Sequence, residues 1–191
     1  MPEIQNDKNI FIETLEWICQ KLAASGIPYM ITGGSAVGFW GHIRTTMDID
    51  IVIQIYGKQI NTFLQDIEKE AYVDIEEAKR SILNRSMFNI ILNNTCFKVD
   101  IIPLDDKNEY ELEKFKRRIK IEFHNRDIFV TSPEDLIISK LLWGKSAGGS
   151  ERQLRDSESI YKLNCGTLDL NYIKKWVKIL NIEDEFNKIT V

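Results

Sequence analysis

Two aspartates stand one residue apart in an apolar run of this 191-residue chain, DIDIVI at residues 48–53. In a β-strand, side chains two residues apart project from the same face, so Asp48 and Asp50 are expected to lie close together. Two carboxylates this close repel each other unless a cation lies between them. Mg²⁺ prefers carboxylate oxygens and keeps coordination positions open for phosphate. The pattern therefore predicts a divalent-metal site, with Mg²⁺ or Mn²⁺ as the ion.

A third carboxylate, Asp100, lies in a second apolar run, FKVDIIPL at residues 97–104. If the two runs are neighbouring strands, Asp100 reaches the same site. Two cations about 3.5–4 Å apart can hold the attacking and leaving oxygens of an in-line phosphoryl displacement. The alternative interpretation pairs Asp100 with Lys98 or with a turn, and leaves Asp48 and Asp50 on a solvated edge strand.

A glycine pair, Gly33 and Gly34, separates an expected strand at 28–32 from an expected helix at 35–43. Backbone N–H groups at a helix start and the helix dipole favour an anion, and glycine permits its close approach. Ser35 adds a hydroxyl donor in the same turn. On its own the pair would be an ordinary structural turn, but together with the two aspartates it predicts a site for a metal-bound triphosphate.

The elements that position these residues follow from periodicity and turn signals. Strands come first, interleaved with helices, and only helical patterns follow Ser132, which with two acidic residues behind it is a strong helix start. This order predicts an α+β fold: a core at residues 1–131 and a helical C-terminal region at 132–191 packed on it. Strands are expected at 28–32, 48–55, 86–94, 96–104, 119–125 and 126–132, and helices at 9–24, 35–43, 57–70, 108–118, 132–143, 151–163 and 169–180.

Composition excludes several classes of protein. The chain is 43% hydrophobic with a net charge of −4, which is typical of a globular protein and argues against a nucleic-acid coat protein. Its three cysteines are far apart and form no CxxC pair, which favours reduced thiols over a disulfide framework or a zinc site. The first ten residues do not resemble a signal peptide, and no apolar run is long enough to span a membrane. We therefore expect a cytoplasmic location.

The run GGSAVGFWGHIRTTMDIDIV (33–52) resembles the signature of the DNA polymerase beta-type nucleotidyltransferase superfamily. That signature places a hydrophobic residue and Gly-Gly or Gly-Ser before a gap and an Asp-hydrophobic-Asp run. A second run, at residues 132–161, is similar to the C-terminal half of the small bacterial AbiEii-like nucleotidyltransferases. Lys140 and Asp156 match positions of that group, whereas Ser159 stands where a second acid is usual.

The resemblance implies a nucleotidyltransferase-type mixed β-sheet core and transfer of a nucleoside monophosphate from an NTP to an acceptor hydroxyl, with release of pyrophosphate. It implies metal binding by Asp48, Asp50 and Asp100, the last of which also helps to deprotonate the acceptor. The same resemblance implies that the nucleotide is bound by Gly33, Gly34, Ser35, Arg44 and Lys140.

For that group, the resemblance suggests RNA or tRNA, or a protein hydroxyl, as acceptor. It also suggests the toxin-like component of a toxin–antitoxin or phage-defence pair, with a cognate antitoxin as partner. Three alternatives stay open at this point. They are a catalytically silent nucleotide-binding regulatory module, a small-molecule (antibiotic-type) nucleotidyltransferase, and a protein-interaction domain, which would leave the aspartates unexplained.

Overall fold

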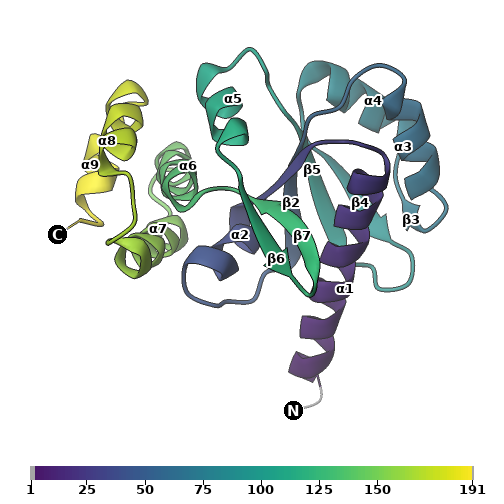
Figure 1. The fold of residues 1–191 in the computed structure, drawn as a ribbon, viewed down its shortest axis with the longest axis horizontal. Coiled ribbons are helices and arrows are strands. Elements are labelled where there is room, and N and C mark those ends of the chain that lie inside the picture. The colour runs from purple at the N-terminus through teal and green to yellow at the C-terminus, as the bar shows by residue number, and fades with distance from the viewer. Residues whose placement is uncertain (1–2, 191) are drawn as a thin grey trace.

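A mixed seven-stranded sheet lies at the centre of the computed structural model, which describes residues 3–190 (Figure 1). The strand order is β3-β4-β5-β2-β1-β7-β6. β2 and β5 pair in parallel, whereas β1 and β2 pair antiparallel. The strands are β1 (Tyr29–Thr32), β2 (Asp48–Ile53), β3 (Ala71–Tyr72), β4 (Phe88–Leu92), β5 (Lys98–Pro103), β6 (Ile119–Phe123) and β7 (Arg126–Val130).

Helices surround this sheet, and the four that follow it in sequence gather on one side, away from α3 and α4 (Figure 1). This arrangement confirms the α+β prediction with its helical C-terminal part. The division at residue 131 remains a prediction, although the last strand ends at Val130. The helices are α1 (Glu3–Ala24), α2 (Gly33–Trp40), α3 (Gln59–Ile67), α4 (Ile75–Asn84), α5 (Glu109–Lys116), α6 (Pro133–Ser146), α7 (Glu151–Asn164), α8 (Leu170–Ile179) and α9 (Glu183–Asn187).

The two faces of the central strands differ in character. One face of β2 and β5 carries fully buried side chains, such as Ile49, Ile51 and Ile101, that belong to the main core. The other face carries the aspartates and, further along β2, Val52, which packs in a small apolar cluster with Phe115 of α5. Because strand side chains alternate, α5 covers only the far half of this second face.

Two local expectations required correction. The second helix begins at Gly33, not at residue 35, so both glycines lie in its first turn. The segment between the expected elements at 57–70 and 86–94 contains β3 and the amphipathic helix α4, which Asp74 caps by accepting a hydrogen bond from the backbone N–H of Glu77. The strands expected at 86–94 and 96–104, and those expected at 119–125 and 126–132, pair antiparallel as β4–β5 and β6–β7.

Within residues 3–190, no helix combines the length and the apolar character that crossing a lipid bilayer requires.

Ser132 closes the first turn of α6. Its Oγ accepts a hydrogen bond from the backbone N–H of Asp135 at 3.2 Å and donates one to Oδ2 of the same residue at 2.7 Å. We expect Ser132→Ala to lower the free energy of unfolding by about 1–2 kcal/mol, because a buried cap is lost. Ser146→Ala, at the exposed end of the same helix, is the matched control, with an expected change below about 0.5 kcal/mol. Urea denaturation measures both, and equal effects would contradict the capping role.

Candidate functional site

The pairing of β2 with β5 brings three aspartates onto one face of the sheet. In this parallel register, Asp50 lies opposite Asp100 and Asp48 lies opposite Lys98. The side chain of Asp100 is 7% exposed and that of Asp48 is 32% exposed, so the group runs from the interior to the surface. The sheet thus assembles, from two segments about fifty residues apart, the three carboxylates that the sequence singled out.

Lys98 lies between two of these carboxylates. Its Nζ is 2.9 Å from Oδ2 of Asp100 and 3.7 Å from Oδ2 of Asp48. The hydrogen bond to Asp100 raises the pKa of this ammonium above its ordinary value. The pairing of Asp100 with Lys98 that the sequence left open is therefore present, and one fixed positive charge offsets part of the repulsion between the aspartates.

The first turn of α2 lies against Asp50. The backbone N–H of Gly34 donates to Oδ2 of Asp50 at 3.1 Å, and Ser35 Oγ donates to the carbonyl oxygen of Asp48 at 3.1 Å. Gly33 has a φ of +59°, and a Cβ atom there would lie 2.0 Å from Oδ2 of Asp50. The glycine turn and the carboxylate are thus in direct contact, so this helix start faces the aspartates themselves.

The carboxylates retain unused capacity for a cation. Burial raises the pKa of Asp50, and although the Gly34 N–H opposes that shift, the charge of Asp48 adds to it. The Oδ1 atom of Asp100 is buried and accepts no hydrogen bond. Among residues 3–190, no group of three or more His, Cys, Asp or Glu side chains is arranged to hold a metal ion. A buried orphan oxygen beside two further carboxylates nevertheless fits a hard divalent cation, once the side chains turn toward it.

A second charged network centres on Asp156 of α7, whose side chain is 1% exposed. Arg44 binds it through two hydrogen bonds of 3.0 Å, from Nε to Oδ1 and from Nη2 to Oδ2. Lys140 Nζ lies 3.1 Å from Oδ2, and His42 Nε2 lies 3.7 Å from Oδ1. Burial opposes ionisation of Asp156, but the Arg44 hydrogen bond and the Lys140 charge outweigh it and lower the pKa.

This network changes the interpretation of Lys140. The resemblance implied that Lys140 helps to bind the nucleotide, and the structure adds that this lysine is buried and paired with Asp156. Burial lowers the pKa of Lys140, and Asp156 opposes that shift. Asp156 thus fixes the positions of Arg44 and Lys140, so these two cations are preorganised for binding an anion.

Gly34 joins the two networks. A Cβ atom on Gly34 would lie 3.1 Å from Arg44 Nη2 and 2.8 Å from Thr46 Oγ1. Thr46 in turn donates to Oδ1 of Asp48 at 3.1 Å. The aspartates of the sheet and the cations around Asp156 therefore meet at one helix turn, as a metal–triphosphate site requires.

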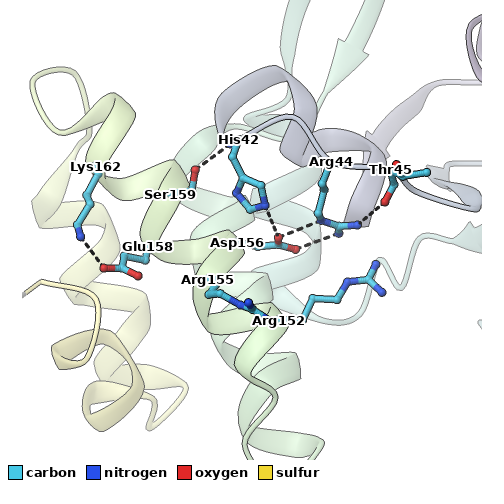
Figure 2. Close-up of a pocket in the computed structure, with 9 residues that line it drawn as sticks. All are labelled: His42, Arg44, Thr45, Arg152, Arg155, Asp156, Glu158, Ser159 and Lys162. Atoms are coloured by element: carbon cyan, nitrogen blue, oxygen red, sulfur yellow. Dashed lines mark hydrogen bonds and ion pairs between the residues drawn. The ribbon is translucent and has the colours of Figure 1, made fainter. Parts of the chain in front are cut away.

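Beside Asp156 lies a pocket of roughly 690 Å³, shown in Figure 2. Sequence reasoning gave His42 no role and did not single out two arginines of α7, although their RQLRD spacing places them three residues apart on one helix face. The pocket lies between the loop that follows α2 and helix α7. Its lining comprises His42, Arg44, Thr45, Arg152, Arg155, Asp156, Glu158, Ser159 and Lys162.

Residues 11–189 match the family described as "Nucleotidyltransferase of unknown function (DUF6036)". The chain belongs to this nucleotidyltransferase family. No functionally curated protein matches it in sequence. The match names neither the AbiEii-like group nor a toxin role, and these stay predictions.

Solved structures of nucleotidyltransferases share the fold of this DUF6036 chain. An antigenic nucleotidyltransferase-like protein from Paracoccidioides brasiliensis is 16% identical, with a TM-score of 0.61 over 93% of this chain and 90% of its own. The antibiotic-resistance factor ANT(2'')-Ia is 12% identical, with a TM-score of 0.62 over 94% and 97%. The lincosamide antibiotic adenylyltransferase LnuA is 16% identical, with a TM-score of 0.54 over 79% and 96%. These identities establish the fold and leave the acceptor undetermined.

Gly33→Ala tests the contact between the helix turn and Asp50. Gly26→Ala is the matched control, because Gly26 has a similar φ of +61° but no atom within 4 Å of its Cβ position. Both variants carry a left-handed strain of about 1–2 kcal/mol. We expect Gly33→Ala to lose about 1–3 kcal/mol more, from overpacking against Asp50. Thermal or urea unfolding measures the difference, and equal losses would show that Asp50 moves aside freely.

Lys98→Met tests the resident positive charge among the aspartates. Without this ammonium the three carboxylates repel more strongly, so we expect a lower melting temperature without metal and a larger rise when Mn²⁺ is added. Lys120→Met is the control, since Lys120 forms only a surface ion pair with Asp127. If Mn²⁺ raises the melting temperature of Lys98→Met no more than that of the wild type, Lys98 does not compete with a metal ion.

Proposed function

We propose that this protein is a metal-dependent nucleotidyltransferase that moves a nucleoside monophosphate from an NTP to an acceptor hydroxyl. In the reaction, the acceptor oxygen forms a bond to the α-phosphorus, and the bond from that phosphorus to the bridging oxygen breaks. Pyrophosphate leaves, and the hydroxyl proton passes to a base. One observation carries the proposal: Asp50, paired in register with Asp100, also touches the first turn of α2.

The aspartates supply the metal site of this proposal. Asp48, Asp50 and Asp100 would hold Mg²⁺ or Mn²⁺, which when bound neutralises the triphosphate and orients the reacting oxygens. Asp100 has the further role of accepting the hydroxyl proton. Its buried Oδ1 has no hydrogen-bond donor, so that atom is available to the acceptor.

The nucleotide phosphates would bind at the start of α2. Gly34 N–H and Ser35 Oγ now donate to Asp50 and to the Asp48 carbonyl, and they exchange these partners for phosphate oxygens when the metal-bound nucleotide arrives. Gly33 leaves the room for that approach. Arg44 and Lys140, held by Asp156, place two positive charges beside the same turn.

The acceptor hydroxyl belongs, in this proposal, to RNA such as tRNA or to a protein, in a toxin-like component with a cognate antitoxin. Support comes from the C-terminal resemblance at Lys140 and Asp156. Transfer to a small antibiotic is the chemistry named for ANT(2'')-Ia and LnuA, whose folds this chain shares.

A second candidate function is a nucleotide-binding regulatory module without turnover. The specific observation in its favour is Lys98, which pairs with two of the three aspartates. Ser159 is a second observation in favour of this candidate. It stands where the AbiEii-like group usually has an acid, and its Oγ accepts a hydrogen bond from the backbone N–H of His42. Incubation with each NTP and Mg²⁺ separates the two candidates: pyrophosphate release on addition of an acceptor requires turnover.

Asp48→Asn and Asp50→Asn should abolish the stabilisation that an NTP with Mg²⁺ gives the wild type. A ligand present at one hundred times its Kd stabilises the folded state by about 2.7 kcal/mol, which a thermal melt detects. Asp127→Asn, at an exposed position of β7, is the control and should keep the full Mg²⁺-dependent shift. Normal shifts in both site variants would refute the metal site.

The same melts without metal test the sign of the Asp50 pKa shift. Its folded pKa is above the ordinary value of 3.8, so the contribution of Asp50 to wild-type stability falls as the pH rises from below 3.8 through the folded pKa. Asp50→Asn lacks this loss, because the amide does not ionise. At neutral pH without metal, the variant should be at least as stable as the wild type.

A further inference from the structure

The pocket beside Asp156 continues directly from the proposed transfer site. Arg44 lies in both: it lines the pocket, and its Nη2 is 3.1 Å from the Cβ position of Gly34, in the turn that contacts Asp50. A molecule in this pocket is therefore next to the reacting groups. The three aspartates of the sheet do not line the pocket, and neither do Gly34 and Ser35. The pocket is therefore separate from the proposed metal and phosphate positions.

The charge of this pocket is opposite to that of the whole protein. Four cationic side chains line it (Arg44, Arg152, Arg155 and Lys162) against two carboxylates, Asp156 and Glu158. The chain as a whole has a net charge of −4. The lining therefore carries an excess of positive side chains although the whole chain is negative, and this excess favours a negatively charged ligand.

The two arginines of α7 carry the uncompensated part of this charge. Arg44 is engaged by Asp156, and Lys162 by Glu158. Among the side chains that the structure describes, Arg152 and Arg155 form no ion pair, and Figure 2 shows them beside Asp156 without a dashed line to any other lining residue. Both are exposed, and three residues apart they project from one face of the helix.

Two free guanidinium groups on one helix face are suited to phosphate. Arginine presents a planar fork of donors that matches phosphate oxygens in a bidentate way. The lining holds no Phe, Tyr or Trp on which a nucleobase could stack, so recognition here depends on phosphate rather than on base identity. A polycationic amine would be repelled by the same groups.

We propose that this pocket is the acceptor subsite and that the acceptor carries phosphate, which Arg152 and Arg155 bind. The inference rests on the proposed function, since only a transferase has an acceptor. It narrows the acceptor to phosphate-bearing hydroxyl compounds, whose source is either a nucleic acid strand or a small sugar phosphate.

The test measures binding of two probes, a short single-stranded oligoribonucleotide and ribose 5-phosphate, to the full chain. The test variant is Arg152→Gln/Arg155→Gln. The control is Lys174→Gln/Lys178→Gln, which removes the same charge from exposed positions on α8. Thermal shift with NTP and Mg²⁺ is recorded in parallel for every variant, so that nucleotide binding is read separately from acceptor binding.

We expect the arginine variant to bind the probe roughly tenfold more weakly or worse, with an unchanged shift from NTP and Mg²⁺. For the oligoribonucleotide, the plot of log affinity against log salt has a negative slope, and the arginine variant should make that slope shallower by about 1.4, at roughly 0.7 per phosphate contact on a single strand. The control should match the wild type. If the oligoribonucleotide binds and its binding depends on the two arginines, the acceptor is a nucleic acid. If only ribose 5-phosphate binds in this way, the acceptor is a small sugar phosphate. Both results support the proposal.

Three results would overturn it. If the wild type responds to NTP and Mg²⁺ but binds neither probe, or binds them equally after both arginines are replaced, the acceptor proposal fails while the proposed function stands. If replacing the arginines reduces the shift from NTP and Mg²⁺, the pocket holds the triphosphate and not the acceptor. If the wild type shows no Mg²⁺-dependent shift with any NTP, the proposed function fails and the acceptor subsite with it.

Discussion

Repulsion among three carboxylates on one face of the sheet is the constraint around which the rest of the site is arranged. The parallel register of β2 and β5 fixes Asp50 opposite Asp100, and neither strand can slip by one residue without turning its apolar face outward. The surroundings answer this repulsion with directed donors: the Gly34 N–H, the Thr46 hydroxyl and the Lys98 ammonium. Each donor offsets part of the negative charge that a divalent cation would neutralise at the proposed metal site.

Asp156 has the opposite role, as one buried anion surrounded by cations. Its partners come from the loop after α2 (Arg44) and from α6 (Lys140), while the aspartate itself belongs to α7. Removing one partner of a buried charged group leaves the others uncompensated, which is costly. This carboxylate therefore does two things at once: it links α7 to α6 and to the loop after α2, and it fixes the orientation of two positive groups.

The sequence was informative where periodicity and chemistry coincide. Alternation in DIDIVI placed Asp48 and Asp50 on one face, and the apolar run predicted a strand around Asp100. That this strand lies beside β2 is known only from the structure. The sequence did not predict which side chains pair with one another. Lys140 is a helical lysine, which usually lies at the surface, and only the packing of α6 against α7 shows that it is buried. His42 and the α7 arginines gave no signal, because their importance depends on a loop and a helix more than a hundred residues apart.

That separation has a consequence for how the protein is made. The two hydrogen bonds between Arg44 and Asp156 span 112 residues, whereas the one between Gly34 and Asp50 spans 16. Contacts between distant segments form late, because the entropy of closing the intervening loop must be overcome first. During synthesis the glycine turn and the first two aspartates can meet early, but Arg44 and Lys140 lack their shared partner until α7 has emerged. A nascent or truncated chain would thus bring its glycine turn and first carboxylates together long before Asp156 could hold these two cations.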